Sequence, residues 1–206
     1  MVSKKTGNKG YSLVEMIIVL AIIGIVSGIS IASVTMIHSA KAKDASVVFD
    51  AEISELIAKS KSMNNSDGLY AIRLYREGST FYIQSGTAKK SSDNKTWLFT
   101  VSPNNKNGQK GTNVSKYVKI AYVPEGTAYS DTWLDSYDDF WNTPQTDMGG
   151  TPKLKLDGGS AITGTLILYT KSGDCLSGNG TFGFYKRNGH MVARVIVRKN
   201  GSHEAR

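Results

Sequence analysis

The chain has 206 residues, of which 40% are hydrophobic, and a formal net charge of +8 at neutral pH. That length fits one domain of ordinary size with an appendage, and so moderate a basic excess does not by itself indicate a nucleic-acid partner. A single cysteine excludes an intramolecular disulfide and argues against a cysteine-ligated zinc site. The 21 glycines and only 4 prolines are typical of a turn-rich β structure.

An apolar segment of membrane length lies close to the N-terminus. The run from Met16 to Ile37 contains 22 uncharged residues, and as a helix it would be about 33 Å long, which matches the hydrocarbon thickness of a bilayer. Three lysines precede it, and positive charge next to a single span stays in the cytoplasm. We therefore expect a single-pass inner-membrane segment at 16–37, with the C-terminal part outside the cytoplasm.

The residues directly before this run are Lys-Gly-Tyr-Ser-Leu-Val-Glu, at positions 9–15. This sequence resembles the processing site of type IV pilins and of the pseudopilins of secretion and competence systems, and the resemblance covers roughly residues 1–40. It implies that a prepilin peptidase cuts after Gly10 and methylates the new amino terminus at Tyr11. Without the leader and its three lysines the net charge would be +5. The resemblance also implies other pilin or pseudopilin subunits and a membrane assembly platform with an ATPase as partners.

Glu15 is the residue that most needs an explanation, because a carboxylate in the hydrocarbon costs about 2–3 kcal/mol at the bilayer centre and less near the interface. It could be an interfacial side chain in contact with headgroup water. In the cleaved chain, however, Tyr11 and Glu15 would lie one helical turn apart on one face. Resemblance to pilins then implies that the charged amine at Tyr11 of one subunit pairs with Glu15 of its neighbour, which is the interpretation we favour.

The apolar run and the residues after it predict one long helix. Gly24, Gly28 and Ala32 are spaced so that their small side chains share a stripe, which predicts close helix packing in a bilayer or filament. Beyond Ile37 the pattern becomes amphipathic and predicts a helix face that packs on the rest of the protein; its stripe consists of Ala45, Val48, Phe49, Glu52, Ile53, Leu56 and Ile57. We expect a leader at 1–10, a helix at 11–65 and a β-rich head at 66–206.

The competing interpretation of the N-terminus is a secretory signal peptide. Ala40, Lys41 and Ala42 would form its small-x-small cleavage site, and the mature chain would begin at Lys43. Glu15 interrupts the transition from basic to apolar residues, and 22 uncharged residues exceed the usual length of the apolar part. These two features favour pilin-type processing.

Several strands are predicted after the helix, in the order of an α+β pilin-like fold with an antiparallel sheet. Two hairpins stand out: 69–75 with 80–84, and 181–186 with 190–198, the second joined by an Asn-Gly pair that suits a type I′ turn. Further strands are expected at 96–101, 117–123 and 162–171. Residues 103–116 are rich in Asn, Gly and Lys and are expected to form an exposed, mobile loop.

Charge is segregated in the second half of the chain. Residues 125–157 contain seven acids and two lysines, whereas 171–206 contain seven Lys or Arg and two acids. A short amphipathic helix is expected at 130–143, and its aspartates between Asp131 and Asp139 invite a calcium hypothesis, although their spacing favours a solvated face. The basic residues predict a surface that binds neighbouring subunits. DNA is another possible partner of this surface, but it is not favoured. The residues are Lys186, Arg187, Arg194, Arg198 and Lys199.

Enzymatic motifs are missing from the sequence. Its three histidines have no metal-ligand spacing, and no glycine-rich phosphate loop opens a helix. Cys175 is expected in a turn at 171–175 and has no histidine near it in sequence, so it is interpreted as a free structural thiol. We therefore expect no catalytic residues, no metal and no cofactor. The favoured function is a structural subunit of a type IV pilus or pseudopilus, outside the cytoplasm after assembly. The alternative is a membrane-anchored or secreted domain that binds sugar or DNA and never polymerises.

Overall fold

The computed structural model describes residues 11–62, 68–92, 94–105, 107, 109–116, 118–126, 153–186 and 189–206, with the side chains of 30–32 and 115 left out. The chain divides into two compact units, Met1–Ile37 and His38–Arg206. Among the described residues there is one helix, α1, which begins at Leu13 and ends at Ser62. The architecture is α+β: one long N-terminal helix is followed by a head made of strands, as the sequence predicts.

The first unit is the N-terminal part of α1. It contains no proline and no charged residue between Met16 and Ile37, so nothing in the sequence interrupts the helical hydrogen bonds. Large apolar side chains are exposed on all sides of this part, among them Leu13, Ile25 and Ile37. By length and composition, the helix could cross a membrane.

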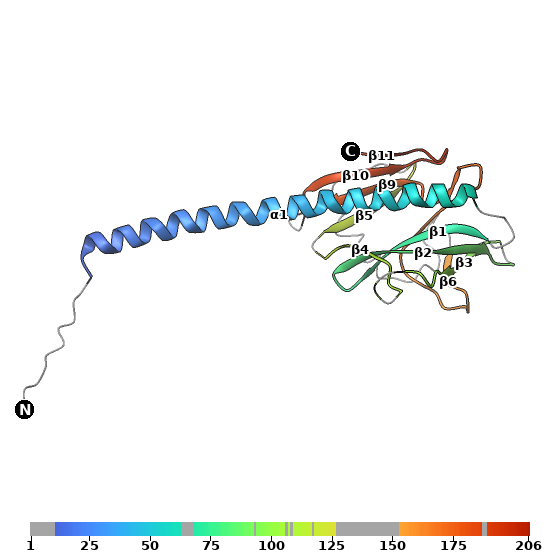
Figure 1. Cartoon of the computed structure of the whole chain (residues 1–206), viewed down its shortest axis with the longest axis horizontal. Coiled ribbons are helices and arrows are strands. Elements are labelled where there is room, and N and C mark those ends of the chain that lie inside the picture. Colours follow the sequence, from blue (N-terminus) through green and yellow to red (C-terminus); the bar gives the residue numbers. More distant parts are fainter. Residues whose placement is uncertain are drawn as a thin grey trace, which may run out of the picture. The chain divides into compact units, whose positions relative to one another are not determined.

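The second unit is the head, whose described residues form the rest of α1 and eleven strands (Figure 1). The strands are β1 Leu69–Glu77, β2 Thr80–Lys90, β3 Thr96–Val101, β4 Thr112–Ser115, β5 Lys119–Pro124, β6 Lys153–Leu156, β7 Thr165–Tyr169, β8 Cys175–Ser177, β9 Gly180–Tyr185, β10 Met191–Val197 and β11 His203–Ala205.

The strands form two sheets. The larger has seven strands in the order β6-β3-β2-β1-β7-β8, with β4 also paired to β2, and the smaller has the order β11-β10-β9-β5. All pairs are antiparallel except β3 with β6. In Figure 1, β9, β10 and β11 lie on one side of the helix and β1, β2 and β3 on the other.

The main core lies between α1 and the two sheets. The helix contributes Ala42, Ala45, Phe49, Ile53 and Leu56, all of them buried, and both sheets contribute the rest. The predicted apolar stripe is therefore confirmed, with Val48 and Ile57 partly buried at its edge.

A second core lies on the opposite face of the larger sheet. Side chains alternate across a strand, so Ala71 and Leu168 belong to this second core while their neighbours Ile72 and Ile167 belong to the first. Trp97, Phe99 and Leu154 complete it. Both faces of the larger sheet are thus packed.

Both predicted hairpins are present. β1 and β2 pair from Leu69–Ala88 to Glu77–Thr80, and Gly78, the first of the two turn residues, has a φ of +59°, which suits a tight hairpin turn. β9 and β10 also pair antiparallel, with a shift in register between Met191 and Ala193. The strand expected at 96–101 is β3, and those expected at 117–123 and 162–171 are the shorter β5 and β7.

The loop expected at 103–116 is shorter than predicted, although most of its described residues up to Lys110 are exposed, as expected. Its last part is β4, which pairs with β2, and Val114 is buried in the main core. The side chain of Asn105 is held by four hydrogen bonds to Ser85 and Ser102. Part of the polar composition of this segment thus serves to form hydrogen bonds with β2. The short strands β6, β8 and β11 were not predicted either.

Candidate functional site

The N-terminal end of α1 carries the residues that the sequence singles out. Tyr11 and Ser12 precede the helix, and Tyr11 is 83% exposed. Gly10 lies outside the described residues. The expected arrangement of Tyr11 and Glu15 on one helical face concerns the cleaved chain, and in this uncleaved chain Tyr11 is not helical.

Ser12 and Glu15 form a reciprocal cap at the start of α1. The backbone N–H of Ser12 donates to Oε2 of Glu15 over 2.9 Å, and the backbone N–H of Glu15 donates to Oγ of Ser12 over 3.2 Å. Two backbone donors that the helix leaves unpaired are thereby satisfied, which is the capping-box arrangement. The carboxylate also lies in the first turn, where the helix dipole favours negative charge.

The cap gives Glu15 a partner within its own chain, which was not predicted from the sequence. The signal was available, since a serine followed three residues later by a glutamate, ahead of an apolar run, is the capping-box signature. The second oxygen, Oε1, has no hydrogen-bond partner among the described residues. It is therefore left to accept a donor from another molecule.

The small-residue stripe of the helix is open. A side chain added at Gly24 or at Gly28 would meet nothing within 4 Å. Ala32 lies in the helix, but its side chain is outside the described residues. Exposed apolar side chains surround the two glycines, among them Ile22 and Ile29. The structure thus leaves this face of the helix free for close contact with another helix.

A family model described as the prokaryotic N-terminal methylation motif matches residues 5–31. The chain carries the N-terminal methylation motif of type IV pilins and pseudopilins. No curated protein and no solved structure matches the chain. The methylation motif spans the expected cleavage point, the capping box, and Gly24 and Gly28 of the small-residue stripe. Together with the apolar helix, it supports a pilin-like or pseudopilin-like precursor, a structural subunit anchored in a membrane.

The basic residues predicted as a partner surface lie at the end of β9 and along β10. Arg194 is on β10, Arg198 follows it, and Lys186 follows β9, whereas Arg187 is outside the described residues. Arg198 pairs with Glu204 over 3.2 Å, and Arg206 pairs with the same carboxylate over 2.7 Å. These hydrogen bonds, chiefly that from Arg206, lower the pKa of Glu204.

The carboxylate of Glu204 thus interrupts the basic surface, since it already occupies Arg198 and Arg206. Lys199 lies in the turn after β10, where its backbone N–H is held by Glu125 over 3.1 Å. The partner surface stays a prediction. The expected helix at 130–143 and the acidic cluster Asp131–Asp139 lie outside the described residues, so the calcium hypothesis stays open as well.

One serine, histidine and aspartate come together in the head. Nε2 of His203 is 3.1 Å from Oγ of Ser54 and 3.5 Å from Oδ1 of Asp50. A catalytic relay needs the acid on the other ring nitrogen, Nδ1, so that Nε2 can accept the serine proton. Here both partners meet the same nitrogen, and the contact instead fastens β11 to α1.

Cys175 begins β8, although the sequence predicted a turn there, and it is a buried free thiol. Its Sγ donates to the carbonyl oxygen of Ser177 over 3.0 Å. Burial raises the pKa of the thiol to about 12. A thiol that keeps its proton is a poor nucleophile and a poor metal ligand, which agrees with the structural role expected for it.

Proposed function

We propose that this protein is a subunit of a type IV pilus or pseudopilus. A prepilin peptidase removes residues 1–10 and methylates Tyr11, and the product is assembled with other subunits into a filament. One observation carries the proposal: the methylation motif, at residues 5–31, leads into a helix whose apolar side chains are exposed. A soluble protein would hide such a surface.

Before assembly, the exposed helix is covered by lipid. The span of 22 uncharged residues has the length that a bilayer needs, and the three lysines before it favour a cytoplasmic leader and a head on the other side. The capping box supports insertion because it satisfies two backbone N–H groups that would otherwise enter the hydrocarbon unpaired.

After assembly, neighbouring helices replace the lipid. Gly24, Gly28 and Ala32 let two backbones approach closely. The free oxygen of Glu15 then accepts the charged amine at Tyr11 of the next subunit, while its other oxygen can keep the cap to Ser12. Pairing both charges lowers the cost of placing either of them in an apolar filament core.

Processing is tested by expressing the full-length chain with and without a prepilin peptidase and measuring its intact mass. We expect loss of residues 1–10 and gain of one methyl group only when the peptidase is present. Gly10→Val should abolish both changes, while the matched variant Gly7→Val, three residues upstream in the same leader, should not. A mature chain beginning at Lys43 would instead indicate signal-peptidase cleavage and overturn the proposal.

The role of Glu15 is tested with two variants that separate charge from capping. Glu15→Val removes both, whereas Glu15→Gln keeps an oxygen that can cap Ser12 and loses only the charge. We expect both variants to insert in the membrane and both to enter filaments several-fold less than the wild type. Normal incorporation of Glu15→Gln would mean that the cap, and no ion pair between subunits, is what the carboxylate provides.

A further inference from the structure

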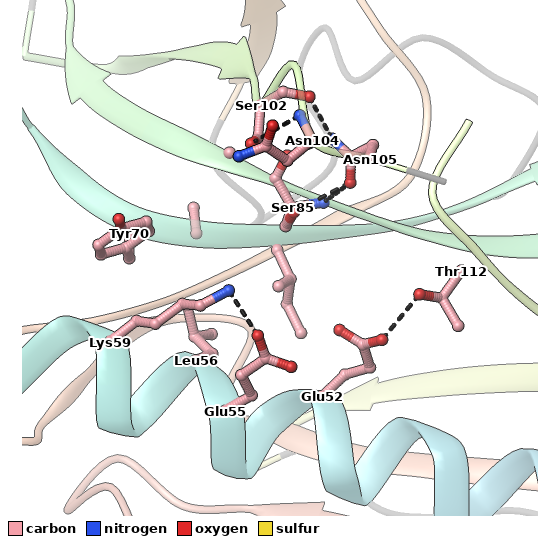
Figure 2. A pocket seen from close by; sticks show the side chains of 13 residues that line it. Glu52, Glu55, Leu56, Lys59, Tyr70, Ser85, Ser102, Asn104, Asn105 and Thr112 are labelled. Atoms are coloured by element: carbon pink, nitrogen blue, oxygen red, sulfur yellow. Dashed lines mark hydrogen bonds and ion pairs between the residues drawn. The ribbon is translucent and has the colours of Figure 1, made fainter. Parts of the chain in front are cut away.

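The head contains a pocket of about 340 Å³ between α1 and the larger sheet (Figure 2). Its floor is formed by β1 and β2, one wall by Glu52, Glu55 and Lys59 of the helix, and the opposite wall by the segment that follows β3. Figure 2 shows the two glutamates directed from the helix toward the sheet. The volume lies in the range of pockets that hold small molecules.

The pocket wall formed by the segment after β3 is held rigidly by hydrogen bonds. Oδ1 of Asn105 accepts hydrogen bonds from the backbone N–H and the hydroxyl of Ser85, both over 2.9 Å. Its Nδ2 donates to the carbonyl oxygens of Ser85 and Ser102 over 2.7 and 2.8 Å. All four hydrogen-bonding positions of this amide are in use, so the wall keeps its shape without a ligand.

The wall formed by the helix is also held by polar contacts, but some of its polar atoms have no partner among the described residues. Glu52 accepts a hydrogen bond from the Thr112 hydroxyl through Oε1 over 2.8 Å, and Oε1 of Glu55 pairs with Lys59. Each carboxylate keeps a second oxygen without a partner among the described residues. The side-chain amide of Asn104 and the hydroxyl of Tyr70 also have no partner there.

The polar groups of the two walls define the ligand chemistry. The oxygens of Glu52 and Glu55 accept, the ammonium of Lys59 donates, and the groups of Asn104 and Tyr70 can do both. An amine would need acceptors only and an anion donors only, whereas hydroxyl groups donate and accept at once. Two carboxylates and one ammonium give the pocket a charge of −1, which disfavours anions such as phosphate or a uronic acid.

The apolar part of the lining completes this pattern. Leu56 and Ile72 belong to the main core at the base of the pocket, and the ring of Tyr70 packs against the same core. They can contact the C–H face of a sugar ring while the polar walls bind its hydroxyls. From this geometry we infer that the pocket binds a neutral saccharide, held by Glu52, Glu55 and Asn104. This binding activity is additional to the proposed filament function and does not depend on it.

The test is a titration of the full-length chain in a zwitterionic detergent, because detergents with sugar headgroups would compete for the pocket. The ligands are the methyl glycosides of glucose, galactose, mannose and N-acetylglucosamine, and binding is measured by calorimetry and by saturation-transfer NMR. We expect at least one of them to bind with millimolar affinity. The corresponding methyl glucuronoside, which adds one carboxylate to the glucose ring, should bind several-fold more weakly.

Two variants place the binding in this pocket. Glu52→Gln should raise Kd about tenfold, since a hydrogen bond to a charged group is exchanged for a neutral one, and its amide oxygen can still accept from Thr112. Asn104→Ala, at an exposed side chain that holds nothing in place, should raise Kd about threefold to tenfold. The matched controls are Glu77→Gln, whose carboxylate pairs with Lys110 away from the pocket, and Asn113→Ala on β4; neither should change Kd.

Two results would overturn the inference: no saturable binding of any of the glycosides by the wild type, or binding that Glu52→Gln and Asn104→Ala leave unchanged. Neither result would touch the filament proposal, because peptidase processing and assembly are measured without sugar.

Discussion

Arg73 is a cation inside the head, and its partners are neutral. Its Nε donates to the carbonyl oxygen of Thr163 over 2.8 Å and its Nη1 to Oε1 of Gln84 over 3.0 Å. The guanidinium lies 4.0 Å from the centroid of the Tyr75 ring. Burial lowers its pKa to about 10, which leaves it charged at neutral pH. A planar group that donates in two directions while stacking on a ring can meet all three partners at once.

We expect Arg73→Lys to lower the free energy of unfolding by about 1–2 kcal/mol, although it conserves the charge, because an ammonium cannot stack flat and reach both acceptors. The measurement is urea unfolding followed by tryptophan fluorescence. Arg194→Lys on β10 is the control and should stay within about 0.5 kcal/mol of the wild type. Equal effects of the two substitutions would contradict the role given to the guanidinium.

The thiol of Cys175 should be unreactive until the head unfolds. We expect iodoacetamide at pH 8 to modify it slowly in the native chain and quickly in denaturant, because burial shields the sulfur and holds its pKa at about 12. The control places a cysteine at the next residue, Leu176→Cys with Cys175→Ala, where the side chain is exposed; it should react at once. Fast native modification of Cys175 would contradict its burial.

The raised pKa of the Cys175 thiol also determines how this group makes the stability of the fold depend on pH. The folded state keeps the thiol proton up to about pH 12, whereas the unfolded chain releases it near the ordinary value of 9.0. Stability is therefore unaffected by this group below pH 9.0 and falls as the pH rises from there toward 12. Burial also raises the pKa of Tyr169, which acts in the same direction.

Neither Arg73 nor Cys175 could be assigned its environment from the sequence. The alternation of β1 predicts a strand, but one hydrogen-bond partner of Arg73 lies 90 positions away, at Thr163. Cys175 comes after Ser172, Gly173 and Asp174 and was predicted to lie in a turn, while its burial depends on the pairing of β8 with β7. Whether such a residue is buried depends on pairing between strands that are distant in the sequence, and the local sequence pattern does not indicate that pairing. The capping box, by contrast, is local, and its signature is present in the sequence.

At the scale of elements, α1 is one helix with two kinds of surroundings. The predicted stripe in its second half follows the helical period, and its residues are buried where the period places them. Phe49 lies at the centre of this stripe, with ring centroids 4.6 Å from Phe182 and 5.7 Å from Phe184. These ring contacts pack the helix on β9 of the smaller sheet, within the main core to which both sheets contribute.

We expect Phe49→Ala to destabilise the head by about 3–5 kcal/mol, because it removes a fully buried ring and leaves a cavity between the helix and β9. Val47→Ala provides the control on the same helix, two residues away and 58% exposed, and should change the free energy of unfolding by less than about 0.5 kcal/mol. Denaturant titration of both variants measures the difference. A small effect of Phe49→Ala would mean that the helix is not packed on the sheets.

Strands were predicted well where their partners are neighbours in the sequence, and poorly elsewhere. The hairpins β1–β2 and β9–β10 have alternating side chains and short turns, so local patterns suffice. β6 and β8 have four and three residues, and such short runs carry little periodicity. β6 also pairs in parallel with β3, so that Thr96 meets Lys153, a register that no turn could indicate.

At the scale of the whole molecule, the head has a core of its own. No residue before Ala42 belongs to either hydrophobic core among the described residues. We therefore expect a chain that begins at His38 to be soluble and to unfold cooperatively, since the exposed apolar part of the helix has been removed. Circular dichroism and urea unfolding measure this. A truncated chain that aggregates or melts without cooperativity would show that the head needs the first unit in order to fold.

The exposed part of α1 predicts contact between helices of different subunits. Ala21 lies on the same helix face as Gly24 and Gly28, about one turn before the first and two turns before the second. A cysteine at position 21 should therefore come close to the same cysteine of a neighbouring subunit when subunits assemble. Ala21→Cys is introduced with Cys175→Ala so that the chain has one thiol. In cells with the assembly platform, we expect oxidation or a short bismaleimide to give covalent dimers, whereas without the platform the chain should stay mostly monomeric.

Gly28→Ile in the Ala21→Cys chain makes this prediction specific. A branched side chain on the glycine stripe keeps two helix backbones apart, so the dimer yield should fall several-fold, while membrane insertion should be unchanged because the substitution is apolar. Ile29→Leu, one residue away and off the stripe, is the matched control. Dimers in equal yield from both variants would mean that subunits meet through another face. Only monomer from the parent chain would favour a membrane-anchored domain that does not polymerise.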